Sequence, residues 1–228
     1  MMTVFAAGGM VMWPLLFFSL LAIALIIERL VFWLRISRNQ TPMLRRVLRS
    51  YRDDVPTAIA LLKQNLSFPV ARIFTEALAL NSPTPSQFRL ALESATQAEL
   101  PKLRRFNTIF ETIIALSPLL GLLGTVLGLI GSFASINLTE GSAGNAGAVT
   151  GGISEALVST AAGLVVGIFV LLFANGFRGL YRRQLALIQE YGGQLEILYE
   201  MHHASSAQWE TAQKNAQKNA QEMHYANS

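Results

Sequence analysis

Three long apolar stretches are the feature that most constrains the fold of this chain. They lie within residues 10–34, 109–136 and 153–177. A helix crosses a hydrocarbon core of about 30 Å with roughly 20 apolar residues, and each stretch is long enough to do so. The stretches are apolar on most helical faces, so their length and scarcity of charge identify them, whereas periodicity does not. We therefore predict an all-α membrane protein with three transmembrane helices.

The composition supports a membrane location. Hydrophobic residues make up 52% of the chain and charged residues only 14%, whereas a soluble domain carries roughly 25% charged residues. The chain contains no cysteine, which excludes disulfides and thiolate metal sites. A net charge of +4 is compatible with nucleic-acid binding. The positions of the charges follow a membrane topology instead, and we expect no nucleic-acid partner.

The basic residues are distributed asymmetrically about the three stretches. Residues 1–9 and 137–152 contain no Lys or Arg, whereas 13 of the 18 basic residues lie between Glu28 and Glu111 and the other five follow Phe177. Lys and Arg near span ends accumulate on the cytoplasmic side. We therefore predict a multi-pass inner-membrane protein with a periplasmic N-terminus and a cytoplasmic C-terminus. No basic region precedes the first span, so we expect it to be retained and not cleaved as a signal peptide.

Prolines divide the cytoplasmic segment, residues 35–108, into several short predicted helices. These prolines are Pro42, Pro56, Pro69, Pro83 and Pro85. We predict one helix over residues 57–66 and another over residues 68–80. A further helix should begin at Gln87 with Ser86 as its N-cap, cross Pro101 and continue into the second span.

Other parts of the cytoplasmic region are also predicted to be helical. Leu44, Val47 and Leu48 share one face of a helix at the start of the segment. The third span should continue over residues 178–203, so that the second and third spans both extend into a helical cytoplasmic body. Residues 204–228 form a polar tail without an assigned role. Neighbouring His202 and His203 point apart on a helix, and we expect neither a metal site nor a cofactor.

Small residues gather on one broad face of the second span and recur in the third. They include Gly121, Gly124 and Gly128 in the second span and Gly163 in the third. Small residues allow close approach of helix backbones in a membrane, where no hydrophobic force draws helices together. Most of these glycines should serve packing within one subunit. Their number exceeds what three helices need, and we infer that copies assemble into a ring.

Four further residues of the second and third spans are candidates for function. Thr125 and Thr160 place hydroxyls within apolar helices, although a helical threonine often bonds a preceding carbonyl of its own helix. Glu155 is either a helix-start carboxylate favoured by the macrodipole or a functional carboxylate at the membrane edge. Pro118 should remove a backbone hydrogen bond and kink the second span. The pair Glu28–Arg29 is better explained as an interfacial anchor.

The motifs of all three spans resemble those of the ExbB/TolQ/MotA proton-channel subunits. Residues 117–126 (SPLLGLLGTV) with Gly128 resemble the second-span signature of this family, and residues 153–157 (ISEAL) with 160–164 (TAAGL) resemble that of the third. The motifs WPL at residues 13–15 and IER at residues 27–29 are similar to the first span. MotA proteins have four spans, so three spans favour the ExbB and TolQ side. The resemblance covers roughly residues 10–200.

The resemblance implies a motor subunit driven by the proton motive force. It implies a homo-oligomer, expected to be a pentamer, around an ExbD/TolR-like single-span partner that carries the intramembrane aspartate. Thr125 and Thr160 would then line the pore beside that aspartate, and Glu155 would lie near the pore mouth or the subunit contacts. Pro118, with Gly121, Gly124, Gly128 and Gly163, would shape and pack the pore helices. The two proteins would be embedded among membrane lipids.

Three other functions compete with the channel. A non-conducting three-span scaffold would tolerate the loss of both threonine hydroxyls. A membrane enzyme would need a nucleophile and a base held together, and the spans contain no such pair. An independent substrate transporter would be expected to show an inverted repeat and more helices. The sequence leaves open the choice between ExbB and TolQ roles, the load that the motor drives and the choice between protons and sodium ions.

Overall fold

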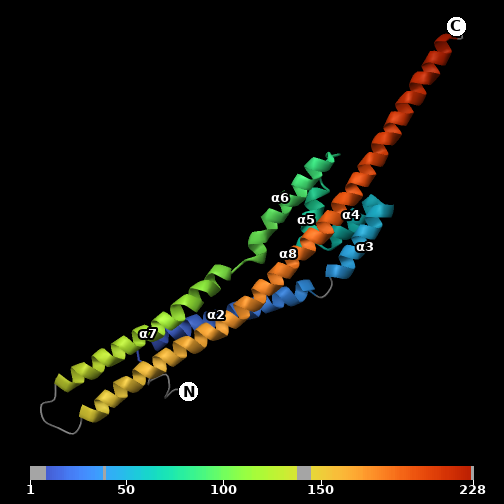
Figure 1. The fold of residues 1–228 in the computed structure, drawn as a ribbon. Helices are drawn as coiled ribbons and strands as arrows, with labels where there is room; N and C mark the ends of the chain where they lie inside the picture. Colours follow the sequence, from blue (N-terminus) through green and yellow to red (C-terminus); the bar gives the residue numbers. More distant parts are fainter. Residues whose placement is uncertain (1–8, 38–39, 138–144, 227–228) are drawn as a thin grey trace. The chain divides into compact units, whose positions relative to one another are not determined.

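The computed structural model describes residues 9–37, 40–137 and 145–226, which are helical apart from short turns (Figure 1). The helices in chain order are α2 (Met12–Ser37), α3 (Gln40–Asp53), α4 (Val55–Gln64), α5 (Pro69–Ala77), α6 (Pro85–Leu103), α7 (Asn107–Asn137) and α8 (Asn145–Ala226). Three of them, α2, α7 and α8, are long and apolar enough to cross a membrane. The predicted all-α class with three candidate spans is therefore confirmed.

The chain divides into two compact units, and helices α2 and α8 contribute to both. The first, here called the apolar unit, contains the described residues up to Trp33 together with Arg104–Tyr181. The second, here called the helical body, contains the described residues of 34–103 and of 182–228. The apolar unit thus holds most of α2, all of α7 and the first part of α8. The helical body holds α3 to α6 and the rest of α8.

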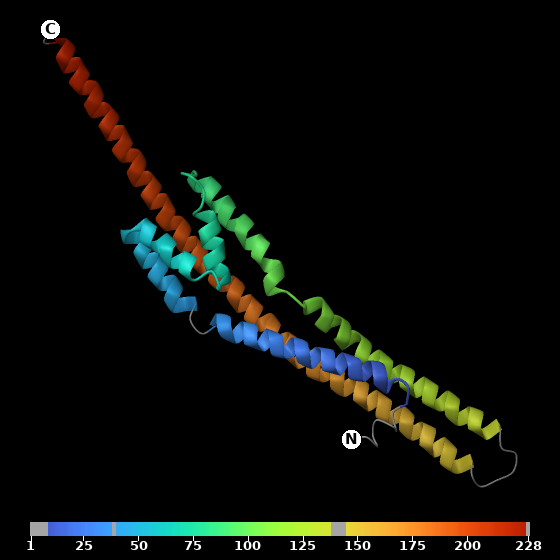
Figure 2. The ribbon, with the colours of Figure 1, turned by 180° about the vertical axis from the view of Figure 1, so that it is seen from behind.

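In the apolar unit, α2, α7 and the first part of α8 lie side by side in both views (Figures 1 and 2). Only 22% to 28% of the most apolar window of each candidate span is buried within the chain. Large side chains such as Trp13, Leu122 and Leu172 are more than half exposed. A bundle with so much apolar surface on its outside needs lipid or further protein around it.

The helical body has a compact core formed by one face of each short helix. Leu44 and Val47 of α3 are fully buried and Leu48 nearly so, as their shared helical face predicts. Phe88 of α6 stacks on Tyr199 of α8, with ring centroids 4.1 Å apart, and the Tyr199 hydroxyl donates a 2.6 Å hydrogen bond to the Pro83 carbonyl. Tyr199 therefore ties α8 to the start of α6.

Prolines lie at the starts of the short helices, whereas the sequence predicted only that prolines separate these helices. Pro56 lies in the first turn of α4, and Pro69 and Pro85 are the first residues of α5 and α6. The start of α6 differs from the prediction because Thr84, not Ser86, is the capping residue. The Gln87 amide donates to the Thr84 hydroxyl, and the Gln87 side chain accepts a 2.9 Å hydrogen bond from the Thr84 amide. This reciprocal pair is a capping box.

The expected continuous helix from residue 87 into the second span is interrupted. Helix α6 does cross Pro101, but it ends at Leu103, and α7 begins at Asn107. Between them Arg104–Phe106 form a turn in which Phe106 has a φ of 68°. This left-handed conformation is unfavourable for a bulky residue and cannot continue a helix. The second span is therefore connected to the helical body through a turn.

Helix α8 is longer at both ends than the predicted elements. Residues 145–152, expected to belong to a loop over 137–152, are helical, as are residues 204–226 of the expected polar tail. Glu140, within that loop, lies outside the described residues, as do residues 1–8 of the predicted periplasmic N-terminus. The predicted span limits of 10–34, 109–136 and 153–177 remain predictions.

Candidate functional site

The candidate residues of the second and third spans meet where α7 packs against α8. A Cβ at Gly121 would lie 3.0 Å from the Thr160 Cα, and one at Gly128 would lie 2.9 Å from the Gly152 carbonyl oxygen. From the other side, a Cβ at Gly163 would lie 2.5 Å from the Ser117 carbonyl oxygen. Real Cβ atoms essentially never approach backbone as closely as at Gly128 and Gly163, so these two positions require glycine, and the contact at Gly121 is nearly as tight. The small-residue face therefore allows α7 and α8 to pack backbone against backbone.

Serine hydroxyls and a proline ring occupy the remaining space along this contact. The Ser159 hydroxyl takes the place that a side chain at Gly124 would need. Gly167 faces Pro118, and a Cβ there would lie 3.3 Å from the Pro118 Cγ. Ser159 is fully buried and donates a 2.9 Å hydrogen bond to the Ala156 carbonyl. Ser159 was not among the predicted functional residues, although its spacing of four from Gly163 and three from Ala156 indicates the same helical face.

This arrangement corrects part of the argument for a ring. Gly121, Gly124, Gly128 and Gly163 are all used by contacts within one chain, which leaves fewer small residues for contacts between copies. Among the described residues of α7 and the first part of α8, the glycines with open space at the Cβ position are Gly131, Gly147, Gly151, Gly176 and Gly179. An inference of assembly must therefore rest on the exposed apolar faces of the helices.

The two candidate threonines differ in the bonds that their hydroxyls make. The Thr125 hydroxyl donates a 2.7 Å hydrogen bond to the Leu122 carbonyl of its own helix. The Thr160 hydroxyl donates across the helix contact to the Gly121 carbonyl at 3.1 Å. Both side chains are partly exposed. Gly121 and Leu122 are consecutive residues of α7, so the two hydroxyls bond adjacent carbonyls of this helix.

Each threonine hydroxyl can still accept hydrogen bonds after it has donated to a carbonyl. A hydroxyl has one hydrogen to donate and two lone pairs that accept. With the hydrogen committed to a carbonyl, the oxygen can still accept a hydrogen bond from water or from a protonated carboxyl group. A carboxylate, which only accepts, requires the hydroxyl to leave its carbonyl first. Each threonine hydroxyl would therefore accept a hydrogen bond from a protonated carboxyl group and donate one to a carboxylate.

Glu155 lies in the third turn of α8, because that helix begins at Asn145. The macrodipole acts within the first turn of a helix, so the interpretation of Glu155 as a helix-start carboxylate is wrong for α8. The Glu155 carboxylate instead lies against Gly9, just before α2, where a Cβ would overlap its Oε1. Gly9 has a φ of +67°, a conformation that glycine adopts readily. Glu155 therefore fixes the approach of the chain to the first span.

Arg29 contacts the turn between α6 and α7. Its side chain is only 2% exposed, its guanidinium donates to the Arg105 carbonyl, and Glu28 lies 3.7 Å away. The guanidinium also lies 5.0 Å from the Phe32 ring centroid and 5.3 Å from that of Phe106. From the sequence, the pair Glu28–Arg29 is predicted to be an interfacial anchor. Only the fold brings the turn at residues 104–106 to Arg29, so no local sequence pattern could have revealed this contact.

The histidines of the helical body make aromatic contacts. His202 meets the Tyr51 ring edge-on at 5.6 Å, and His203 lies 6.3 Å from the Tyr199 ring. Within the part of the chain that the structure describes, no three His, Asp or Glu side chains are grouped as metal ligands would be. The structure describes the backbone of His224 but not its side chain.

Comparison with known proteins connects these features to a family. The model of the MotA/TolQ/ExbB proton channel family matches residues 65–190, which is more than half of the chain and contains the whole α7–α8 contact. A Synechocystis sp. protein named biopolymer transport protein ExbB-like 3 is 64% identical over 197 residues, which cover 86% of this chain and 94% of that protein.

Two further relatives show the same relationship at greater distance. ExbB-like 1 of Synechocystis sp. is 39% identical over 196 residues, covering 86% of this chain and 77% of its own length. The biopolymer transport protein exbB1 of Vibrio cholerae is 32% identical over 165 residues, covering 70% of this chain and 71% of its own length. The family consists of transport channel proteins and not of enzymes. With its three candidate spans, this chain is a multi-pass, ExbB-like member of the MotA/TolQ/ExbB proton channel family.

Proposed function

We propose that this chain is the channel-forming subunit of an inner-membrane motor that uses the proton motive force to energise a partner protein acting in the cell envelope. The observation that carries the proposal is that the Thr125 and Thr160 hydroxyls bond adjacent carbonyls of α7, those of Leu122 and Gly121. Between Glu111 and Arg178 the chain has no charged residues except Glu140 and Glu155. The proton-binding group inside the membrane would therefore come from another chain.

The partner proposed for this role is a single-span protein of the ExbD/TolR type with an intramembrane aspartate. Membership of the ExbB-containing family supports a partner of this type. Subunits of this chain would form a homo-oligomeric ring, proposed to be a pentamer, around the partner's span. The exposed apolar faces of α2, α7 and α8 supply surface for contacts with neighbouring copies, with the partner and with lipid. The Lys and Arg distribution supports a periplasmic N-terminus and a cytoplasmic C-terminus.

The two threonines would act on the partner's aspartate through hydrogen bonds. A protonated aspartic acid can donate to a threonine oxygen while the threonine keeps its carbonyl bond. A deprotonated aspartate instead attracts the hydroxyl hydrogen, and hydrogen bonds to an ionised acceptor are stronger than neutral ones. The gain of that bond offsets the loss of the threonine–carbonyl bond. A threonine hydroxyl can therefore bond the partner's aspartate in both of its protonation states without itself titrating. The hydroxyl would point in a different direction in each state.

Proton entry would supply the energy for movement of the partner within the ring. Moving one elementary charge through a potential of 100 mV releases about 2.3 kcal/mol. That energy is comparable with a few hydrogen bonds of about 1 kcal/mol each. Rearrangement of the threonine contacts in successive subunits is therefore energetically feasible for each proton that crosses.

The test compares isosteric threonine variants in cells and in reconstituted vesicles. Thr125→Val and Thr160→Val keep the shape of the side chain and remove the hydroxyl, whereas Thr125→Ser and Thr160→Ser keep the hydroxyl. We expect the valine variants to assemble with the partner but to lose at least tenfold in proton flux and in proton-driven function. We expect the serine variants to retain most of both activities.

A non-conducting scaffold is the second candidate function. Both threonine hydroxyls already donate to carbonyls of the same chain, which is what a purely structural threonine would do. A scaffold predicts full function in both valine variants. Native mass of the gently extracted complex provides an independent measurement. A ring holding fewer copies of a single-span partner supports the motor, and a monomer that never binds such a partner would exclude it.

A further inference from the structure

Helix α3 carries an uncompensated positive face. Arg45, Arg46, Arg49 and Arg52 are all exposed on it and are here called the arginine face. The opposite face of the helix is buried in the core of the helical body through Leu44, Val47, Leu48 and Tyr51. The packing of these apolar residues therefore directs the four arginines outward.

The arginine face has no acidic partner within the described residues. No ion pair or hydrogen bond joins any of these four side chains to another group there, and Asp53 is the only acidic residue of α3. Some cations elsewhere in the described chain do have an acidic partner, since Arg72 bonds Glu99 and Arg178 bonds Glu111 at 2.8 Å. The four positive charges of α3 are thus available to an external anion.

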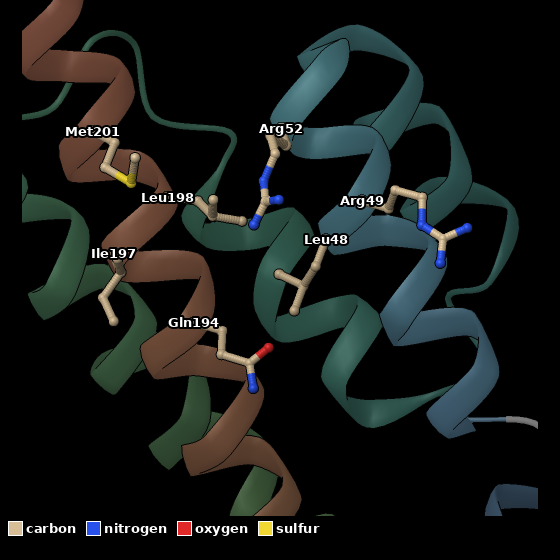
Figure 3. Close-up of a pocket in the computed structure, with 7 residues that line it drawn as sticks. All are labelled: Leu48, Arg49, Arg52, Gln194, Ile197, Leu198 and Met201. Carbon is tan, nitrogen blue, oxygen red and sulfur yellow. The ribbon is translucent and has the colours of Figure 1, made fainter.

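The surface around these arginines is hollowed. Thr41, Pro42, Arg45, Arg46 and Arg49 line an open hollow of about 400 Å³. On the other side of α3, a groove of about 370 Å³ runs between α3 and α8 (Figure 3). Leu48, Ile197 and Met201 are among its apolar lining residues, and Arg49 and Arg52 also line it. The Arg52 guanidinium lies beside Leu198 in Figure 3. Cationic and apolar surfaces therefore lie next to each other.

Chain connectivity keeps the arginine face near a membrane. Helix α2 is a candidate span that ends at Ser37, and α3 begins at Gln40. Three peptide units reach about 11 Å at most, and the five residues from Gln40 to Arg45 add about 8 Å along a helix. The Arg45 Cα is thus no more than roughly 20 Å from the end of α2, whatever the angle between the two helices. A soluble partner would have to reach this position next to a bilayer, whereas lipid headgroups are already there.

We propose that the arginine face of α3 binds the headgroups of anionic phospholipids in the membrane leaflet at the C-terminal end of α2. Guanidinium groups bind phosphate oxygens in a bidentate fashion, and the Thr41 hydroxyl adds a neutral donor in the same hollow. Clusters of four to eight basic residues just outside a transmembrane helix attract acidic lipids. The inference goes beyond the proposed motor, and lipid binding can be tested whether or not the chain conducts protons.

The experiment measures lipid selectivity of the full chain in nanodiscs. The discs contain equal amounts of phosphatidylglycerol and phosphatidylcholine, and native mass spectrometry counts the lipids retained after the disc is removed. The test variant is Arg45→Gln with Arg49→Gln. The matched control is Lys63→Gln with Arg89→Gln, which removes two exposed positive charges from α4 and α6 of the same body. All four positions are exposed, so we expect both variants to fold.

We expect the wild-type chain and the control variant to retain phosphatidylglycerol in preference to phosphatidylcholine, and we expect this preference to fall about 25-fold in the test variant, which lacks two arginines. Each basic residue at an anionic surface strengthens binding by about fivefold. Equal retention of both lipids by the wild type, or equal losses in the test and control variants, would overturn the proposal. If excess inorganic phosphate abolishes the preference for phosphatidylglycerol, the hollow is a site for a free anion and the lipid proposal is wrong. If the test variant keeps the lipid preference but loses a co-purified acidic protein, the arginine face binds that protein and not lipid.

Discussion

At the scale of single residues, the helical body depends on one buried carboxylate. The Glu99 side chain is 7% exposed and accepts hydrogen bonds from Arg72 at 2.7 and 3.0 Å and from Lys102 at 2.7 Å. Burial of the Glu99 carboxyl opposes its ionisation, but the bonds from Arg72 and Lys102 outweigh burial and hold its pKa below the usual value for glutamate. The charged state of Glu99 therefore stabilises the fold.

This carboxylate leads to a prediction for stability and its pH dependence. Glu99→Gln should lower the free energy of unfolding by about 2 kcal/mol at neutral pH, because it leaves Arg72 without its charged partner. Since the folded pKa is lowered, the stabilisation is present above the usual glutamate pKa and is lost as the pH falls through the folded value. The difference between wild type and variant should therefore shrink below about pH 4.

Unfolding in detergent over a pH series measures this difference. Glu93→Gln is the control because Glu93 is an exposed residue of the same helix. We expect that variant to stay within about 0.5 kcal/mol of wild type. An equal loss in both variants, or a loss that does not change with pH, would contradict the role given to Glu99.

A second prediction at this scale concerns the glycine contact of the apolar unit. Gly163→Ala should destabilise the unit by about 1–3 kcal/mol, because the added methyl group meets backbone atoms of Ser117 and Gly121 that cannot move independently. Gly176→Ala is the matched control in the same helix, since nothing lies within 4 Å of its Cβ position. That variant should be neutral or more stable by up to about 1 kcal/mol. Thermal unfolding of both variants in nanodiscs distinguishes the two outcomes, and equal stability would show that α7 and α8 do not pack through Gly163.

At the scale of elements, the turn between α6 and α7 depends on Arg29 of α2. The guanidinium donates to the Arg105 carbonyl and contacts the ring of Phe106, the residue with positive φ. Arg29→Lys keeps the charge but loses the planar group that makes both contacts. We expect amide hydrogen exchange at Asn107, which donates to the Arg104 carbonyl, to become about tenfold faster, equivalent to about 1.4 kcal/mol.

The control for this prediction is Arg35→Lys, on the same helix. Arg35 is exposed, and no contact with the turn is expected from it. Exchange at Asn107 should remain at the wild-type rate in this variant. Unchanged exchange in Arg29→Lys would mean that the turn holds its conformation through local contacts alone.

The elements also show which features of the fold were readable from the sequence. The three spans were predictable because apolar length alone determines them. The division into short helices was predictable because prolines interrupt the segment, although the predicted starts at residues 57, 68 and 87 differ by one or two residues from the observed starts at 55, 69 and 85. The capping box at Thr84 was present as a T-x-x-Q pattern, but Ser86 was an equally acceptable capping residue type. The turn at Arg104–Phe106 could not be predicted, because Phe106 is a residue type that rarely adopts a positive φ. The contact that accompanies this conformation comes from Arg29, which is far away in the sequence.

The candidate site was predictable to a similar extent. The spacing of the glycines indicated a face for close packing, and the structure supplies the partner of that face, which is α8 of the same chain. The partner of the Glu155 carboxylate is Gly9, outside every predicted element, so no periodic pattern connected them. Hydrogen-bond acceptors for the two threonines depend on helix register, which the sequence does not specify. The roles of these residues in proton transfer stay predictions.

At the scale of the whole molecule, the two units differ in what stabilises them. The apolar unit relies on close backbone packing, and the helical body relies on a buried apolar core with the Glu99 ion pairs. Gly163 and Glu99 belong to different units, and their described partners differ: Gly163 packs on Ser117 and Gly121, whereas Glu99 bonds Arg72 and Lys102. Mutational effects at sites without shared partners usually add to within about 0.5 kcal/mol.

The double variant Gly163→Ala with Glu99→Gln tests whether the units are energetically independent. If the units are independent, the double variant should lose as much stability as the two single variants together. At acid pH, only the part of that loss caused by Glu99→Gln should disappear. Helices α2 and α8 run through both units and provide a possible route for coupling. A departure from additivity of more than about 1 kcal/mol would show that packing of the spans and folding of the body are linked. Such coupling is what a motor needs in order to transmit a change at the threonines to the helical body.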